Sequence, residues 1–588
     1  MKRRILLALA AYALLLPAPA QAQNNPAQDF AALRDRYWQW SLENNPALAR
    51  SVGDPRGDTK LSDLSLAHMD TLAQDARTMA QALQKIPVQH LPDDMATDAI
   101  IMGKLLQSTI TAARFGQRAI LFDSYSSWHQ ELVGDAREGN FTTRADYEHY
   151  IARLAAFPKQ AAQAEATTRW ALQHGFVQPC IVVANYPKSL AALTMPDASA
   201  SVFAKPFVQK PAMLSEATWA DLKNRGLGLI QSQLMPALRA YHQFITTDYM
   251  PHCRKTTRIS ATPQGAAYYQ WRIAEETTTT LSADAIHARG LAEVARISAE
   301  MDKVAASAGY SGQREAYIAE LRKNPRYYAQ SPQELLSASA DVAKYIDGQL
   351  PRLFNRLPSL PYGVKPIPQE TADGNTTAYY ETGAWAQHRA AIYRVNTTHL
   401  DQRPLFEIPA LTAHEAVPGH HLQIALQQEM ALSPMRRYLT QYTAFVEGWA
   451  LYAESLGLEM GLYDTPEKNM GRLSYEMWRA CRLVVDTGLH AKGWSREQAK
   501  AYMKAHTALS DANIDAEVTR YIGWPAQALA YKLGELSIKA QRHSAETALG
   551  ENFDLRAFHD QLLAQGALPL DMMEAHTRSW IEAHKSKP

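Results

Sequence analysis

Residues 411–423, LTAHEAVPGHHLQ, hold three histidines and a glutamate close together: His414, Glu415, His420 and His421. Imidazole and carboxylate groups are common ligands of zinc, and a glutamate beside the first histidine is placed to act as a general base. The stretch predicts the metal centre of a hydrolase, and we expect the remaining chain to be built around it.

The spacing of the histidines does not suit one straight helix. A regular His-Glu-x-x-His motif needs its second histidine at position 418, which is a proline. His420 would lie about 240° around the helix from His414, and His421 two turns away, roughly 10 Å along the axis. Pro418 disrupts a regular helix, and Gly419 tolerates the unusual dihedral angles that an interruption of the helix requires. We expect a distorted turn that brings His420 or His421 beside His414; the alternative is that Pro-Gly only ends the helix.

A catalytic zinc site usually has three protein ligands, so a third ligand is needed. Glu447 lies in the next predicted helix, which returns after Ser433-Pro434. Glu454, two turns further along the same face, is the second candidate. The alternative for each is an ordinary solvated or capping carboxylate.

Composition places few limits on the partners. The chain has 588 residues, 46% of them hydrophobic, with 60 basic and 59 acidic residues. No basic face for nucleic acid stands out. We find no fixed-period repeat and no low-complexity linker, which favours a single large helical domain over residues 23–588, with two lobes at roughly 23–350 and 351–588 as a further division.

The first 22 residues have the pattern of a signal peptide. Lys2-Arg3-Arg4 precedes a short apolar run, and Ala20-Gln21-Ala22 resembles a cleavage site. The alternative is an uncleaved anchor. No cysteine follows the apolar run, and no later stretch is apolar enough to span a bilayer. We therefore expect an exported protein, periplasmic or secreted, that is cleaved near Ala22 and not inserted in the membrane.

Export allows the cysteines to oxidise. Cys180 and Cys253 both lie in proline-containing, loop-like sequence, so they either pair or stay free. Cys481 lies in a helical pattern and is expected to be a buried apolar residue.

Most of the chain has helical periodicity. We predict helices over 28–45, 65–85, 93–116, 143–175, 214–246, 282–305, from 331, 433–461, 465–492, and from 495, 510, 525 and 554, with capping residues at several starts. Residues 176–212 are expected to be irregular, and 250–281 to form short extended pieces. The sequence predicts a mainly α fold.

Two runs before the His-Glu stretch are the best strand candidates. Residues 376–382 and 390–397 are rich in tyrosine, valine, isoleucine and threonine. They predict a small β element next to the active-site helix. It either packs on the helices only, or one of its edges borders the active cleft and pairs with the backbone of a bound peptide.

Several motifs in order carry a family resemblance over nearly the whole chain. They are RYWQWSLENNPALARSVGD near the N-terminus, NTTHLDQRPLFEIPALTAHE, HEAVPGHHLQ at 414–423, AFVEGWALYAESLG at 444–457, RLVVDTGLH at 482–490 and RYIGWPAQALAYKLG at 520–534. Together they resemble the bacterial family called DUF885. Where this chain has Ala526 after Pro525, many relatives have glycine, which has no consequence for the metal.

The resemblance implies a fold and a cofactor. The family is similar to helical zinc metallopeptidases with a deep central cleft, which implies one Zn²⁺ per chain. The histidine that matches His420 is constant in the family, whereas the position of His421 can be tyrosine. The implied ligands are therefore His414, His420 and Glu447. Glu415 is then the general base that deprotonates metal-bound water and later protonates the leaving amine.

The later motifs supply candidates for further roles. A tetrahedral oxyanion needs a donor beyond the metal, and Tyr521, His490, Tyr531 and His421 are candidates. Arg479 or Arg482 suits a substrate carboxylate. The alternative for each arginine is a structural ion pair with a helix carboxylate such as Asp486.

Three functions follow in order of preference. The first is a zinc metallopeptidase acting on short peptides. The second is a zinc hydrolase of a non-peptide amide or ester with the same centre. The third is a periplasmic binding protein with a vestigial metal site. Peptide specificity, exo- or endopeptidase action and oligomeric state are not predicted.

Overall fold

The computed structural model describes residues 25–372, 376–385 and 389–585. The predicted signal peptide lies outside these residues. Helices form 70% of the structure, beside a small three-stranded sheet, which confirms the mainly α fold class. None of the helices in the described part has the length and apolar composition that a bilayer crossing requires.

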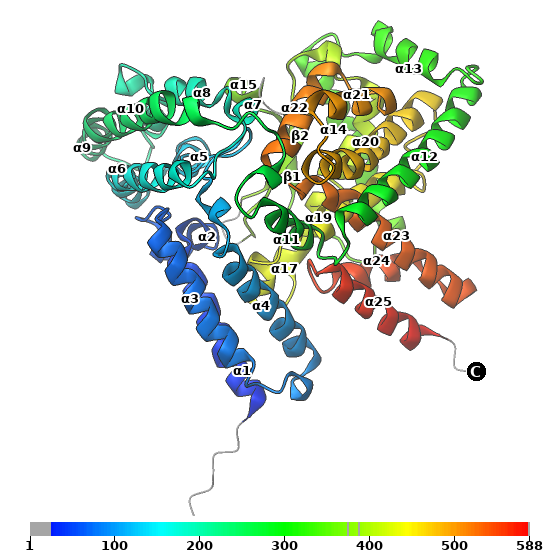
Figure 1. Cartoon of the computed structure of the whole chain (residues 1–588), viewed down its shortest axis with the longest axis horizontal. Helices are drawn as coiled ribbons and strands as arrows, with labels where there is room; N and C mark the ends of the chain where they lie inside the picture. The colour runs from blue at the N-terminus through cyan, green and yellow to red at the C-terminus, as the bar shows by residue number, and fades with distance from the viewer. Residues whose placement is uncertain (1–24, 373–375, 386–388, 586–588) are drawn as a thin grey trace, which may run out of the picture.

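The first half of the chain forms one side of the molecule, coloured blue to green in Figure 1. Its helices are α1 (Pro26–Asn44), α2 (Pro46–Ser51), α3 (Leu66–Leu83), α4 (Asp93–Ala112), α5 (Gln130–Glu138), α6 (Arg144–Gln173), α7 (Cys180–Val183), α8 (Tyr186–Leu193), α9 (Glu216–Leu229) and α10 (Met235–Phe244). The helix predicted over 214–246 is thus α9 and α10, joined by a π-helical segment at 230–234.

The rest of the chain forms the other side. Its helices are α11 (Gly265–Thr277), α12 (Ala283–Ser307), α13 (Arg314–Lys323), α14 (Pro332–Gln349), α15 (Gln369–Ala372), α16 (Ile408–Glu415), α17 (His420–Glu429), α18 (Pro434–Tyr438), α19 (Thr443–Leu456), α20 (Pro466–His490), α21 (Arg496–His506), α22 (Asp511–Gly523), α23 (Ala530–Leu549), α24 (Leu555–Leu563) and α25 (Leu570–His584). The predicted caps are present: Ser282 and Ser331 cap α12 and α14, and Ser495 with Gln498 forms a capping box at α21.

Three local predictions are wrong. Residues 176–212, which were expected to be irregular, contain the short helices α7 and α8. Residues 250–281 contain helix α11, because Tyr269, Ile273 and Thr277 recur every fourth residue and are buried together; strand propensity depends strongly on such context. The single helix expected over 433–461 is instead α18 and α19. Gln427 donates hydrogen bonds to backbone carbonyls of 436 and 440, which satisfies the end of α18 and lets the chain turn.

The sheet has the order β1-β3-β2. Strands β2 (Ala378–Glu381) and β3 (Ala391–Val395) fall in the two predicted runs and pair antiparallel. Strand β1 (Tyr362–Pro366), in the proline-rich stretch that precedes them, was not predicted and pairs parallel with β3. Strand β2 is therefore an edge strand.

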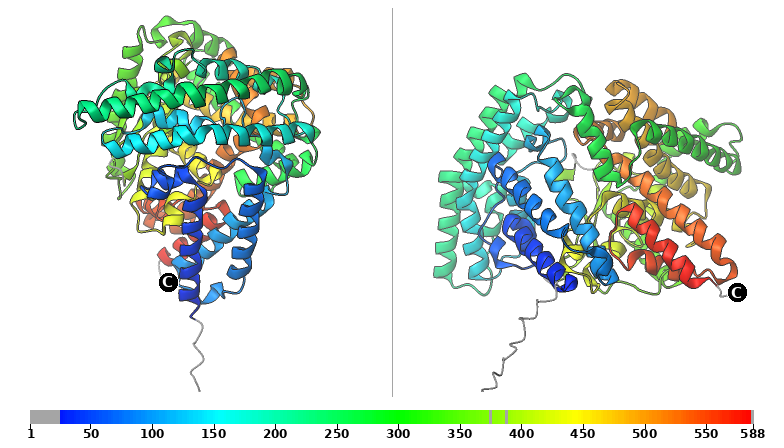
Figure 2. Two further views of the ribbon diagram at one scale, coloured as in Figure 1. Left: turned by 90° about the vertical axis from the view of Figure 1, so that its left-hand side faces the viewer. Right: turned by 60° about the horizontal axis from the view of Figure 1, so that its bottom comes forward.

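One hydrophobic core runs through the molecule, with members from Phe30 to Ile581. Helix α12 packs along α20, so a lobe boundary near residue 350 does not separate two packed bodies. Figures 1 and 2 show the helices α1–α10 gathered on one side of the molecule, beside the remaining helices. Cys180 and Cys253 form a disulfide that links the first residue of α7 to the residue that follows Met250–His252, and Cys481 is buried and free.

Helices α19 and α23 approach each other closely. A Cβ atom on Gly534 would lie 1.8 Å from the carbonyl oxygen of Ala444, and one on Gly448 would lie 2.5 Å from the Cα of Gly534. Only glycine allows this backbone contact. It holds Glu447, on α19, against the start of α23, where Tyr531 lies.

Candidate metal centre

The chain between the histidines does not continue as one helix. Helix α16 ends at Glu415 and α17 begins at His420, and residues 416–419 form a turn with a cis Val417-Pro418 bond. The interruption expected at Pro418-Gly419 is therefore present. A Cβ on Gly419 would lie 1.9 Å from the carbonyl oxygen of His414, so the turn requires glycine at this position. The indole of Trp449 donates to the carbonyl of Pro418 and anchors the turn on α19.

The turn places His420, and not His421, beside His414. The ring centres of His414 and His420 are 4.8 Å apart. The Nε2 atoms of both rings lie 3.4 Å from the same oxygen, Oε2 of Glu447. Nitrogen and carboxylate ligands at about 2.0–2.2 Å from a tetrahedral zinc are separated by about 3.3–3.5 Å. The three side chains form a group whose candidate ligand atoms lie within 4.8 Å of one another.

The protonation pattern fits a cation at this position. Nδ1 of His414 lies 2.8 Å from Oε1 of Glu454, so a neutral His414 carries its proton there and presents the lone pair of Nε2 to Glu447. Nε2 of His414 and Oε2 of Glu447 are then two acceptors that face each other. Either a proton or a metal ion between them removes the repulsion. Burial opposes protonation of His414, yet the neighbouring carboxylates of Glu447 and Glu454 raise its pKa to about 9. Among the described residues, Nδ1 of His420 and Oε2 of Glu447 have no hydrogen-bond partner.

Glu454, the second candidate for the third ligand, orients His414 and does not reach the candidate metal position. It also pairs with Arg479, whose Nη2 lies 3.0 Å from Oε1. A carboxylate on the outer nitrogen of a ligating histidine fixes its tautomer and ring orientation. Glu447 and Glu454 are seven residues apart on α19, and this two-turn spacing is the sequence signal for a ligand and its supporting carboxylate.

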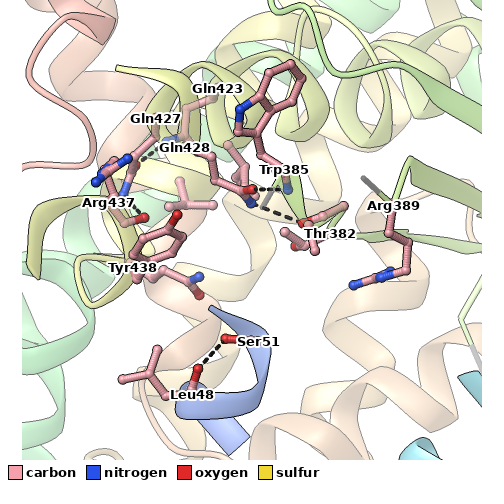
Figure 3. A pocket seen from close by; sticks show the side chains of 15 residues that line it. Leu48, Ser51, Thr382, Trp385, Arg389, Gln423, Gln427, Gln428, Arg437 and Tyr438 are labelled. Carbon is pink, nitrogen blue, oxygen red and sulfur yellow. Dashed lines mark hydrogen bonds between the residues drawn. The ribbon is translucent and has the colours of Figure 1, made fainter. Parts of the chain in front are cut away.

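A cavity of about 310 Å³ contains the three candidate ligands and Glu415. Its walls come from α16, α17, α19, α20, α22, α23, strand β2 and Tyr125 of the N-terminal half. Two further cavities, one larger and one smaller, share lining residues with it. A cavity of about 1130 Å³ shares Thr376, Thr377 and Arg520 with it, and one of about 220 Å³ shares Thr382, Ile424 and Val446. Figure 3 shows this smaller side cavity, with Thr382 and Arg437 on its wall.

The edge strand β2 lines the central cavity. Residues 376 and 377 lie where the cavity meets the large one, and Thr382 lies where it meets the side cavity. The backbone N–H of Asn396 donates to the carbonyl of Thr377, and alternation along an antiparallel pair turns the backbone groups of Ala378 and Tyr380 away from β3.

Of the further predicted site residues, Tyr531, Arg479 and Arg482 line this cavity. The ring of Tyr531 lies 6.4 Å from that of His414, nearly parallel to it. The predicted ion pairs of the arginines exist, but with other partners than Asp486: Arg479 pairs with Glu454 and Arg482 with Glu517. Glu517, Arg520, Tyr380 and Tyr125 also line the cavity and were not predicted, because single residues on unrelated elements leave no local pattern.

Three predicted site residues do not line the cavity. His421 packs against Tyr362 and Tyr380 of the sheet, and burial lowers its pKa to about 4. The hydroxyl of Tyr521 is fully buried and accepts from Trp478 and Arg482. Its geometry positions Arg482 and does not place a donor in the cavity.

His490 is a neutral structural imidazole in this fold. Its Nδ1 accepts from the backbone N–H of Ile259, and its Nε2 donates to the carbonyl of Tyr521. Burial lowers its pKa to about 4. Both ring nitrogens are in use, so the geometry does not support the catalytic role predicted for it.

The neutral His490 predicts a pH dependence of stability. Because the folded pKa lies below the unfolded value near 6.5, the stabilisation is complete above about pH 6.5 and is lost as the pH falls towards 4. We expect His490→Gln, which keeps one acceptor and one donor, to reduce the slope of the free energy of unfolding in this window by about 1.4 kcal/mol per pH unit. Urea unfolding at several pH values measures it, and an unchanged slope would contradict the assignment.

The fold and the site together define a mainly α protein with a cluster of two buried histidines and a partly buried glutamate beside a short edge strand. A family model described as "Bacterial protein of unknown function (DUF885)" matches residues 46–576, so the chain belongs to the DUF885 family. No curated protein matches the chain.

The solved structures that resemble the fold include the following two. One is described as "putative lipoprotein from Colwellia psychrerythraea"; it is 29% identical, with a TM-score of 0.88, and the match covers 95% of this chain and 100% of that one. The other is described as "putative lipoprotein of unknown function from Shewanella oneidensis"; it is 19% identical, with a TM-score of 0.70, over 94% and 99% of the chains. The second likeness concerns the fold alone.

Proposed function

We propose that this protein is a zinc-dependent metallopeptidase that cleaves short peptides. The observation that carries the proposal is the meeting of two histidines on one carboxylate oxygen, with a free glutamate and an edge strand in the same cavity. His414, His420 and Glu447 would hold the ion. Bound there, Zn²⁺ would supply a Lewis acid that polarises a carbonyl and acidifies water.

Glu415 supports the hydrolytic part of the proposal. It follows His414 directly, at the last residue of α16, and it lines the cavity without being one of the three candidate ligands. We assign it the role of general base, which accepts a proton from the attacking water and passes it to the leaving amine. Tyr531 is the candidate donor to the developing oxyanion, because its ring lies beside His414.

Strand β2 favours a peptide over another amide or ester. An extended peptide adds to an exposed sheet edge through main-chain hydrogen bonds. The backbone groups of Ala378 and Tyr380 face away from β3, and of these the carbonyl of Ala378 accepts a hydrogen bond from the hydroxyl of Thr376. A peptide on this edge would run past the candidate metal position from the large cavity to the side cavity.

The proposed place of action is outside the cytoplasm. The similar structures carry the name lipoprotein, and the Cys180–Cys253 disulfide suits an oxidising compartment. The first residues of the sequence have the composition of a signal peptide.

Metal removal tests the proposal. We expect the purified protein to contain about one zinc per chain. We also expect it to hydrolyse members of a mixture of tri- to octapeptides, with the products detected by mass spectrometry. Chelation should abolish hydrolysis, and added Zn²⁺ should restore it. If acyl amides or esters are hydrolysed while the peptides remain uncleaved, the result would favour a zinc hydrolase of a non-peptide amide or ester. Absence of zinc, with no loss of stability in His414→Ala, would favour a binding protein.

A further inference from the structure

Three arginines line the central cavity, and two of them have all their terminal nitrogens engaged. Arg520 donates from Nε and Nη2 to Glu517 and from Nη1 to Gln527. Arg479 uses one terminal nitrogen for Glu454 and the other for a backbone carbonyl. In both residues, each terminal nitrogen of the guanidinium group has a protein partner.

Arg482 differs from the other two at a terminal nitrogen, although Nε of Arg479 is also buried without a hydrogen-bond partner among the described residues. Its Nε donates to the hydroxyl of Tyr521 and its Nη2 to Glu517, both at 3.0 Å. Its Nη1 is buried and has no hydrogen-bond partner among the residues that the structure describes. The residue is 3% exposed, and its side chain lines the cavity. A buried cationic donor without an acceptor is costly, so the site is built for a further acceptor.

The charge around Arg482 favours an anionic acceptor. Both Arg482 and Arg520 form an ion pair with Glu517. Although burial opposes it, the two guanidinium groups lower the pKa of Glu517 to about 2, so the carboxylate stays ionised. The two positive guanidinium groups share one negative carboxylate, so these three side chains together carry a net positive charge. A planar guanidinium matches the geometry of a carboxylate.

The position of Arg482 limits which carboxylate can reach it. The ring of Tyr531 lies 4.2 Å from the guanidinium carbon of Arg482 and 6.4 Å from the ring of His414. The path from His414 to Arg482 is therefore no longer than about three extended residues, at roughly 3.3–3.6 Å per residue.

We propose that Arg482 binds a carboxylate of the peptide substrate within about three residues of the bond that is cleaved. The inference rests on the proposed function and deepens it. The carboxylate is either the C-terminus of the peptide, which makes the enzyme an exopeptidase of short C-terminal fragments, or an acidic side chain near the cleaved bond. Tyr521 and Glu517 act as positioning residues that aim the guanidinium.

The zinc-loaded protein with native sequence gives the first test, using one cleaved peptide synthesised in four forms. The forms carry a free or amidated C-terminus, each with Glu or Gln near the cleaved bond. We expect the loss of one carboxylate to lower kcat/KM about tenfold or more, mainly through KM. Dependence on the C-terminus identifies an exopeptidase, and dependence on the side chain identifies acidic specificity. Equal rates for all four forms would overturn the proposal.

Variants then locate the effect. Arg482→Met should abolish the preference between the acid and the uncharged form, and Arg482→Lys, which retains a charge beside Glu517, should reduce it. The matched control is Arg225→Met, because Arg225 lies on α9, pairs with Glu148 and Asp221, and lines none of these cavities. A preference that persists in Arg482→Met, or that is lost in Arg225→Met, would overturn the assignment.

A binding measurement separates this proposal from the proposed function. Calorimetry with the Glu415→Gln variant compares the affinity for the acid and amide forms without turnover. If peptides are cleaved but neither rate nor affinity depends on a carboxylate, only the role of Arg482 fails. If no peptide is cleaved by the zinc-loaded protein, the proposed function fails, whatever the affinities are.

Discussion

Replacing Glu415 with glutamine is expected to lower kcat for peptide hydrolysis by about 10²–10⁴-fold, the usual contribution of a general base. Glutamine has nearly the same shape and cannot accept the proton of the attacking water. Because Glu415 is not one of the three clustered ligands, the variant should keep one zinc per chain and the stability of the native protein. Single-turnover hydrolysis and metal analysis of the same preparation measure both properties.

The control for this variant is Glu582→Gln, the same change on the exposed face of α25. It should leave hydrolysis and zinc content unchanged. Full peptidase activity in Glu415→Gln would remove this residue from the mechanism. Loss of zinc in the variant would instead give Glu415 a role in holding the ion.

Gly419→Ala is expected to have the largest effect on the structure of the site. The added methyl group would lie 1.9 Å from the carbonyl oxygen of His414 and 2.5 Å from that of Ala413. Both atoms belong to the backbone, so the turn between α16 and α17 must open. We expect a loss of about 2–4 kcal/mol in the free energy of unfolding. Zinc binding should weaken strongly, because His420 moves away from His414.

Gly348→Ala is the matched control, since Gly348 lies inside α14 and a Cβ there meets nothing within 4 Å. Alanine at such a position changes stability by at most about 1 kcal/mol, in the favourable direction. Urea unfolding and zinc titration compare the two variants. Native zinc affinity in Gly419→Ala would show that the geometry of the turn does not control the site.

The part of the site that could be predicted is the part that depends on residues close together in the sequence. Proline at 418 excludes a regular motif, and helix geometry then requires an interruption, which the turn at 416–419 provides. The seven-residue spacing of Glu447 and Glu454 predicts that both lie on one face of α19, where one approaches the histidines and the other supports His414.

The roles of residues in the later motifs could not be assigned in the same way. Tyr521, Tyr531 and His490 lie in similar helical sequence, and only the packing of α20, α22 and α23 decides which side chain reaches the cavity. His490 is engaged by two backbone groups from distant segments. The residue Tyr125 reaches the cavity from the N-terminal half, which no local pattern indicates.

The fold shows the same division. Helices with capping residues were predicted best: α12 with nearly correct bounds, and α14 with its correct start. Helix α11 was missed because its aromatic and β-branched residues favour strands in isolation, whereas burial of Tyr269 and Ile273 against neighbouring helices determines the helix. Strand β1 depends on its parallel partner β3 and has no strong signal of its own.

The most direct test of the central claim is a crystal structure of the purified protein with anomalous data collected on both sides of the zinc absorption edge. We predict one anomalous peak per chain, bonded at about 2.0–2.2 Å to Nε2 of His414, Nε2 of His420 and a carboxylate oxygen of Glu447. A site without an ion after zinc soaking, or an ion held by His421 in place of His420, would contradict it.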